Sequence, residues 1–147
     1  MNRLELVEQR KLPSPNGGGI RVLVADDHRI LREGLSRLLE EQPDIIVIDE
    51  ASDGQMAVEK AVNIHPDVVV MDVGMPLLNG IEATRRILVA VPDVRVIGLS
   101  MHEETHMAAA LKDAGAVAYL RKDCPIEMLL QAIRGRLPKP EVAGASR

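Results

Sequence analysis

The amino-acid sequence predicts an α/β fold with a doubly wound, five-stranded parallel sheet. Short apolar runs rich in β-branched residues alternate about five times with longer stretches whose apolar residues recur at helical spacing. The short runs are almost continuously apolar and end at turn residues, which is typical of strands that are buried on both faces. Because strands and helices alternate, right-handed crossovers place helices on both faces of a parallel sheet.

Each predicted strand is a run of Val, Ile, Leu and Ala that is bounded by turn-forming or charged residues. In chain order, the predicted strands are residues 20–25, 45–48, 67–72, 94–100 and 116–120. Prolines and glycines separate the elements, at Pro66, Pro92, Pro125, Gly54, Gly80 and Gly115.

The stretch that follows each strand carries an apolar stripe of the kind that faces the core from a helix. The stripe residues are, in order, Ile30, Leu31, Leu35, Leu38 and Leu39; Met56, Ala57, Ala61 and Ile64; Ile81, Ile87 and Leu88; Met107, Ala110 and Leu111; and Ile126, Leu129, Leu130 and Ile133. We expect these residues to pack against the sheet.

The chain has the size of one domain, with 147 residues and a mass of 16.1 kDa. Pro and Gly are dense near both ends, which predicts an N-terminal extension or linker at 1–19, a domain at 20–135 and a C-terminal linker or tail at 136–147. Tyr119 is the only aromatic residue of the chain, so the core must consist of aliphatic residues and Met.

The composition excludes several classes of function. With 18 Lys and Arg against 22 Asp and Glu, and almost no rings on which bases could stack, the chain is not expected to contact nucleic acid. Cys124 is the only cysteine, which excludes an internal disulfide and suits a reducing compartment. No apolar run has the length of a signal peptide or a membrane span. We therefore expect a soluble, cytoplasmic domain without membrane contact.

Polar side chains follow the predicted strands at the points where the strands end. Asp26 and Asp27 follow the first strand, Asp72 and Ser100 end the third and fourth, and Lys122 lies just beyond the fifth. The carboxyl ends of parallel strands share one edge of the sheet, where doubly wound folds bind ligands. Neighbouring carboxylates oppose one another's ionisation unless a cation intervenes, and such hard ligands suit Mg²⁺. With a lysine and a hydroxyl, this edge could hold a dianionic group.

Each of these residues also has an ordinary structural explanation. A single Asp after a strand is most often a turn or helix-capping residue, Ser100 can cap the next helix, and Lys122 can be a solvated lysine. These explanations do not account for the position of all of them at one edge. His28 shows no metal-ligand spacing with another histidine or cysteine, so we expect a surface or capping role for it.

Four motifs resemble the receiver domain of two-component response regulators, in particular that of the NarL/LuxR type. They are, in chain order, ADDHRILREG (25–34), MDVGMPLLNG (71–80), VIGLSMH (96–102) and AVAYLRKD (116–123). The resemblance covers residues 20–135 and implies a flavodoxin-like fold with strand order 2-1-3-4-5.

The resemblance implies phosphoryl transfer to Asp72 from the phosphohistidine of a histidine kinase, which forms an aspartyl phosphate. Lys122 would pair with the phosphoryl oxygens. Ser100 and Tyr119 would form the switch, because Ser100 hydrogen-bonds the phosphoryl group while Tyr119 moves between exposed and buried positions. The phosphorylated domain would dimerise and control an output domain outside this chain, most simply a LuxR-type DNA-binding domain.

The resemblance also implies a Mg²⁺ site. Asp27, Asp72 and the backbone carbonyl of Gly74 would bind the metal directly, and Asp26 would act through a bound water. The domain would catalyse only its own phosphorylation and dephosphorylation, so it is not expected to be an enzyme with a separate substrate.

Other functions of related folds fit the sequence less well. A Mg²⁺-dependent phosphatase of the haloacid dehalogenase kind needs an acid two residues after its nucleophile, and Gly74 has that position after Asp72. An FMN or dinucleotide site needs a phosphate-binding loop where this chain has two carboxylates. Two parent proteins are compatible with the sequence: a LuxR-type transcription factor, or a hybrid histidine kinase whose receiver acts as a phosphorelay module or phosphate sink.

Overall fold

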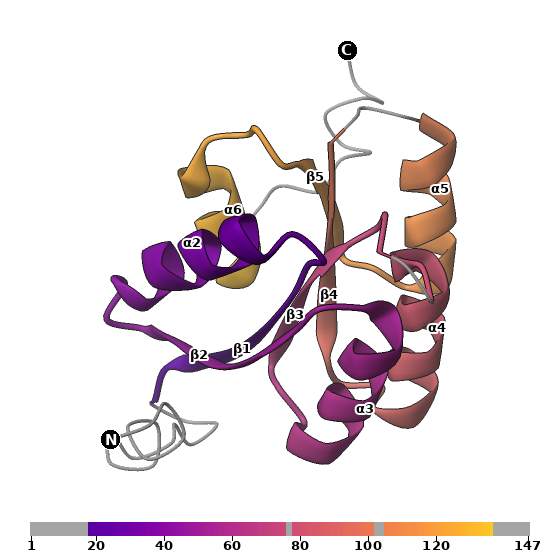
Figure 1. The fold of residues 1–147 in the computed structure, drawn as a ribbon, viewed down its shortest axis with the longest axis horizontal. Coiled ribbons are helices and arrows are strands. Elements are labelled where there is room, and N and C mark those ends of the chain that lie inside the picture. The colour runs from indigo at the N-terminus through magenta and orange to yellow at the C-terminus, as the bar shows by residue number, and fades with distance from the viewer. Residues whose placement is uncertain (1–17, 76–77, 102–104, 137–147) are drawn as a thin grey trace.

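Five parallel strands form one sheet in the order β2-β1-β3-β4-β5, and helices cover both of its faces (Figure 1). The structure is a computed structural model that describes residues 18–75, 78–101 and 105–136. The predicted fold class and strand order are confirmed. The expected extension at 1–19 and tail at 136–147 lie almost entirely outside the described residues.

The strands lie where the apolar runs predict them and differ at their ends. Their bounds are β1 (Ile20–Ala25), β2 (Ile45–Ala51), β3 (Val68–Asp72), β4 (Arg95–Ser100) and β5 (Ala118–Arg121). β2 continues past Ile48 because its next residues still pair with β1, after a register shift between Val22 and Leu23. β5 begins later than predicted because the Ala116 N–H donates back to Leu111 O in the preceding helix.

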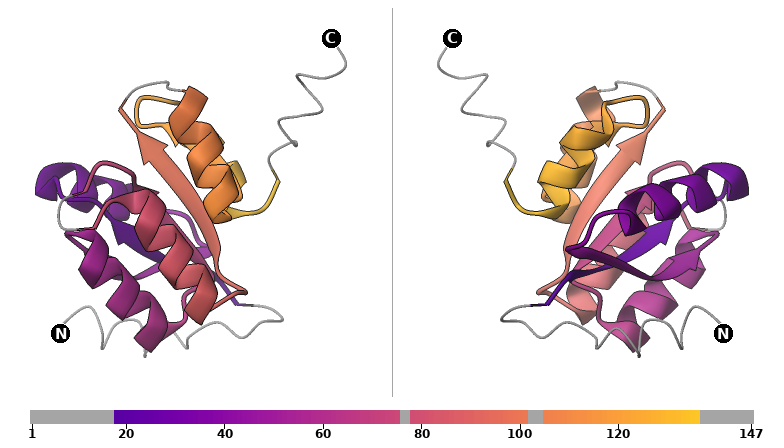
Figure 2. Two further views of the ribbon diagram at one scale, coloured as in Figure 1. Left: turned by 90° about the vertical axis from the view of Figure 1, so that its right-hand side faces the viewer. Right: turned by 90° about the vertical axis from the view of Figure 1, so that its left-hand side faces the viewer.

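The described helices alternate with the strands. Their bounds are α2 (Arg29–Glu40), α3 (Gly54–Ile64), α4 (Gly80–Ala90), α5 (Thr105–Ala114) and α6 (Ile126–Ile133). α2 and α6 cover one face of the sheet, and α3, α4 and α5 cover the other (Figure 2). The Asp53 and Asn79 side chains cap α3 and α4 by accepting hydrogen bonds from the backbone. Within the described ranges, no helix has the length and apolar character needed to cross a membrane.

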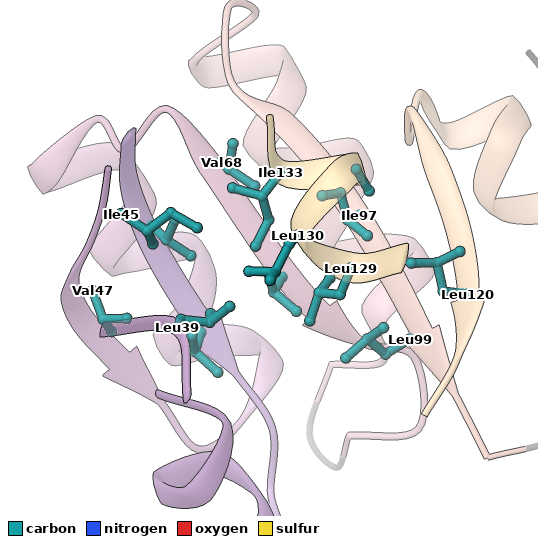
Figure 3. Packing of buried hydrophobic residues seen from close by; sticks show 14 residues of the cluster. Leu39, Ile45, Val47, Val68, Ile97, Leu99, Leu120, Leu129, Leu130 and Ile133 are labelled. Atoms are coloured by element: carbon teal, nitrogen blue, oxygen red, sulfur yellow. The ribbon is translucent and has the colours of Figure 1, made fainter. Parts of the chain in front are cut away.

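Aliphatic side chains fill both faces of the sheet without help from aromatic rings. On one face, Leu129, Leu130 and Ile133 of α6 meet Leu39 of α2 above the strands (Figure 3). On the opposite face, small helix residues, namely Ala57, Ala61 and Ala83, pack in one cluster with larger strand residues such as Leu23, Val69 and Met71. Small side chains let helices approach the sheet closely, and aliphatic residues with Met form the rest of this core.

The apolar stripe predicted for α2 faces the core only in part. Leu39 is fully buried, but Ile30, Leu31 and Leu38 are 85%, 49% and 46% exposed. The prediction that the whole stripe packs against the sheet is therefore wrong for these three residues. A helix presents only one side to a sheet, and in α2 the Leu39 side is turned inward. The three exposed residues instead border an open cavity beside α6.

Candidate functional site

The polar residues predicted at the strand ends meet at one edge of the sheet. Asp26 and Asp27 directly follow β1, and Asp72 is the last residue of β3. Lys122 follows β5, and its N–H donates to Ser100 O at 2.7 Å. The Asp26 N–H donates to Ala51 O at 3.0 Å, which anchors the first loop on the neighbouring strand. The strand ends therefore bring residues that are far apart in sequence to one place.

Asp72 is buried at the centre of this group. Its carboxylate accepts a hydrogen bond from the Gly74 N–H, with Oδ1 at 3.1 Å from the nitrogen. Oδ2 lies 3.3 Å from Lys122 Nζ. Burial raises the pKa of Asp72 to about 6, and the neighbouring carboxylates of Asp26 and Asp27 act in the same direction. The site therefore contains a carboxyl group whose negative charge is poorly compensated.

Asp26 and Lys122 form a buried ion pair. Nζ of Lys122 lies 2.8 Å from Oδ2 of Asp26, and the two side chains are only 10% and 6% exposed. Burial disfavours the charged form of Asp26, but Lys122 and hydrogen bonds from His28 hold its pKa below the ordinary value. Burial also opposes the charge of Lys122, whose pKa is nevertheless raised by Asp26 and Asp72. Both groups are therefore ionised at neutral pH.

Asp27 lies at the outer side of the group, with 29% of its side chain exposed. Its Oδ1 atom is buried and accepts no hydrogen bond from the described residues. His28 Nδ1 lies 3.2 Å from Oδ1 of both Asp26 and Asp27. One ligand atom from each of Asp26, Asp27, His28 and Asp72 lies within 4.8 Å of the others. This donor set, with a buried oxygen that has no hydrogen-bond partner, fits a divalent cation.

The sequence places His28 in the loop beside the acidic residues, but sequence reasoning did not predict that its ring contacts them. His28 is the N-cap residue of α2, as a capping role would require, but its side chain makes no capping hydrogen bond. The ring instead lies against the carboxylates. The signal that could have revealed this is adjacency, because a histidine directly after two carboxylates in a tight turn can reach back to them.

The other predicted site residues lie on the strands that lead to this group or on the loops that follow them. Ser100 is buried at the end of β4. Gly74 is exposed and is held to Asp72 by its own N–H. Tyr119 is partly buried on β5, where its Cα pairs with that of Gly98 on β4. Their expected roles toward a phosphoryl group stay predictions.

An open cavity of about 520 Å³ adjoins the buried ion pair. Asp26 and Lys122 lie at one end of it, and mostly apolar residues of α2, α6 and the loop before α6 form the remainder. The apolar residues include Ile30, Leu31, Leu35, Leu38, Cys124, Ile126 and Leu129. The exposed side of α2 therefore leads directly to the acidic group.

Comparison with known proteins agrees with this fold. Residues 22–134 match the family described as the response regulator receiver domain. The chain is 37% identical over 119 residues to the transcriptional regulatory protein DegU of Brevibacillus brevis, covering 81% of this chain and 50% of that one. It is 41% identical over 115 residues to the response regulator GacA of Pseudomonas viridiflava, covering 78% and 54%. The chain thus spans about half the length of these relatives.

Solved structures show the same similarity. A LuxR-family two-component response regulator from Aurantimonas sp. SI85-9A1 superposes with a TM-score of 0.77 at 35% identity, covering 86% of this chain and 94% of that one. The sheet order, the acidic edge and these matches lead to one conclusion. The chain belongs to the receiver domain family of two-component response regulators, with relatives among the LuxR-type regulators.

Proposed function

We propose that this receiver domain accepts a phosphoryl group on Asp72 from the phosphohistidine of a histidine kinase. The observation that carries the proposal is the cluster of three carboxylates, two of which contact one buried lysine, with Lys122 Nζ 2.8 Å from Asp26 Oδ2 and 3.3 Å from Asp72 Oδ2. The Asp72 carboxylate attacks the phosphorus. The P–N bond breaks, its electron pair returns to the kinase imidazole, and the product is an acyl phosphate on Asp72.

The net negative charge of these residues favours a bound cation, which the proposed reaction requires. When ionised, three carboxylates and one ammonium leave two negative charges uncompensated, which disfavours the approach of an anionic phosphoryl group. Asp27 and Asp72 would hold Mg²⁺ together with the Gly74 carbonyl, and Asp26 would act through a bound water. When bound, this ion would neutralise charge on the phosphoryl oxygens. Lys122 would supply a second positive charge from the other side.

The buried hydroxyl of Ser100 supports a role as a switch. Ser100 is the last residue of β4, and its backbone carbonyl accepts a hydrogen bond from the backbone N–H of Lys122. A phosphoryl group held by Lys122 would draw the Ser100 hydroxyl toward it, and Tyr119 on the neighbouring strand would move into the space that this loop leaves. The change would alter the surface used for self-association and would be transmitted to an output domain.

The cavity beside Lys122 suits the protein that delivers the phosphoryl group. Its exposed apolar residues on α2 lead to the carboxylates, and exposed apolar surface of this kind marks protein contacts. A kinase segment with apolar side chains could cover Ile30 and Leu31 while its phosphohistidine reaches Asp72. A cytoplasmic location, where such kinases present their phosphohistidines, is part of this proposal.

The output is proposed from the relatives, which include transcriptional regulators of about twice the matched length. A DNA-binding domain outside this chain is the simplest output. A receiver module of a hybrid histidine kinase is the second candidate, because its phosphorylation chemistry would be the same.

Phosphorylation with a small donor tests the proposal. Incubation with Mg²⁺ and acetyl phosphate should add one phosphoryl group to the wild-type chain, as measured by intact mass. The Asp72→Asn variant should gain none, whereas Asp93→Asn, at an exposed position outside the site, should behave as wild type. An equal gain of mass in the Asp72→Asn variant would show that the acceptor is elsewhere.

A further inference from the structure

We propose that His28 is a ligand in the metal site and widens its metal range from Mg²⁺ to borderline transition metals such as Co²⁺ and Zn²⁺. The inference rests on the proposed function, because it concerns the same carboxylates. It adds an imidazole nitrogen to a donor set that otherwise consists of oxygen atoms.

Two hydrogen bonds fix the backbone of His28, one to the Asp26 carboxylate and one to the first turn of α2. Its N–H donates to Asp26 Oδ1 at 2.8 Å, and its carbonyl accepts from the Arg32 N–H at 2.8 Å in the first turn of α2. The side chain is 59% exposed, so the ring has room to turn. The backbone therefore keeps His28 beside the acidic group, and the exposed ring can turn one of its nitrogens toward it.

The His28 ring does not satisfy both neighbouring carboxylates, and a bound cation would compensate the oxygen that is left without a hydrogen bond. Nδ1 lies at hydrogen-bond distance from Asp26 Oδ1, and one N–H can serve only one oxygen well. Asp27 Oδ1, at 3.2 Å from the same nitrogen, is buried and accepts no hydrogen bond from the described residues. A cation held by Asp27 would also accept the lone pair of Nδ1 in the tautomer that carries its proton on Nε2, with Asp26 still acting through a bound water.

Ligand preference decides which metals gain from this nitrogen. Mg²⁺ prefers oxygen ligands and water, so the imidazole should add little to its affinity. Zn²⁺ and other later divalent metals bind imidazole well, and their affinity for mixed nitrogen and oxygen sites rises along the series. His28 should therefore discriminate between metals, whereas Asp27 should contribute to the affinity for all of them.

Metal titration of the whole chain tests the inference. Co²⁺ affinity, measured from its visible absorption bands, should fall at least tenfold in His28→Ala, and the bands should shift as a nitrogen ligand is lost. Mg²⁺ affinity, measured by calorimetry, should change less than about threefold in the same variant. His106→Ala, at an exposed position on α5, is the matched control and should bind both metals as wild type does. Asp27→Asn should weaken the binding of both metals.

The outcomes separate the inference from the proposed function. Unchanged Co²⁺ affinity and unchanged bands in His28→Ala would overturn the role of His28 while leaving the carboxylate site intact. Equal losses of Co²⁺ and Mg²⁺ affinity would also overturn it, because a nitrogen ligand should discriminate. Failure of the wild-type chain to bind either metal would instead remove the metal site itself, and with it the basis of the inference.

Discussion

The buried carboxyl groups at the sheet edge differ in how their charge is stabilised. Asp26 is paired with Lys122 at 2.8 Å, whereas Asp72 has a longer contact of 3.3 Å with the same ammonium. One lysine cannot compensate both carboxylates equally, and the pKa directions of the two groups are therefore opposite. At the residue scale, the site keeps one acid reliably ionised and places the other where added positive charge has a large effect.

Replacing Asp72 with Asn is expected to raise the free energy of unfolding near pH 7 by about 1–3 kcal/mol in metal-free buffer. Burial raises the pKa of Asp72 to about 6 from the ordinary value of 3.8, so the folded state retains a proton that the unfolded state releases. The stability due to Asp72 is thus fully present below the unfolded pKa and is lost as pH rises through about 6. In urea unfolding experiments at several pH values, the difference in free energy of unfolding between the Asp72→Asn variant and wild type should become smaller as the pH is lowered through about 6.

Asp26→Asn is the matched control and should act in the opposite direction. Its pKa is held below the ordinary value chiefly by Lys122, against the effect of burial. The stability due to Asp26 is therefore present above the unfolded pKa and is lost as pH falls through the folded pKa. The Asn variant leaves Lys122 with a weaker partner and should be less stable at neutral pH. A stabilised Asp26→Asn variant would contradict this description of the site.

At the scale of elements, α2 has two different apolar sides. Leu39 packs against the sheet, while Ile30 is 85% exposed beside the cavity that leads to Lys122. An apolar residue that is not buried contributes little to folding, and it favours contact with a partner. α2 therefore serves both the core and the surface next to the site.

Ile30→Gln should change the free energy of unfolding by no more than about 0.5 kcal/mol, whereas Leu39→Ala should lower it by about 2–5 kcal/mol. Ile30→Gln should nevertheless slow phosphoryl transfer from a histidine kinase that phosphorylates the wild-type chain. Transfer from acetyl phosphate, which needs no protein contact, should keep its rate. Radiolabel transfer and urea unfolding measure the two effects.

Val89→Gln is the control for this experiment, because Val89 is 83% exposed on α4, on the other face of the sheet. The Val89→Gln variant should accept the phosphoryl group at the wild-type rate from both the kinase and acetyl phosphate. Equal slowing in both variants, or no slowing in Ile30→Gln, would argue that the kinase does not use the cavity side of α2.

At the scale of the whole molecule, the sheet links the acidic edge to the face formed by β4, β5 and the adjoining helices. Ser100 and Arg121 are register partners at the ends of β4 and β5, and Tyr119 pairs with Gly98 in the same ladder. Movement of the Ser100 loop would therefore act on the strand that carries Tyr119. Coupling of this kind is typically worth about 1–3 kcal/mol, which shifts a balanced equilibrium without locking it.

Beryllofluoride, which mimics a phosphoryl group, should change the intrinsic fluorescence of the wild-type chain and increase its self-association. The chain contains one Tyr and no Trp or Phe, so the signal comes from Tyr119 alone. Ser100→Ala should leave the fluorescence largely unchanged because the hydroxyl that moves the loop is missing. If fluorescence and sedimentation are both unaffected while Mg²⁺ binds, the domain is a phosphate sink or docking module.

Much of the fold follows from local patterns. The apolar runs predict the strands because a strand buried on both faces needs apolar residues on both sides, whatever its partners. The ends of the strands are less predictable. β2 continues through Asp49 and Glu50 because these residues pair with β1, although their charged side chains are not typical of a buried strand. The apolar pattern of α2 likewise predicts a helix without showing which of its residues face the core.

The succession of strands and helices along the chain can be predicted from the apolar pattern alone. The same pattern places Asp26, Asp27, Asp72, Ser100 and Lys122 at or just beyond strand ends. How these groups compensate one another's charge depends on the three-dimensional packing. Asp26 and Lys122 are far apart along the chain, and their 2.8 Å contact depends on the packing of β1, β3, β4 and β5. The position of the His28 ring, the raised pKa of Asp72 and the exposure of Ile30 have the same origin. Electrostatic energies and burial depend on distances in space, which local sequence patterns do not contain.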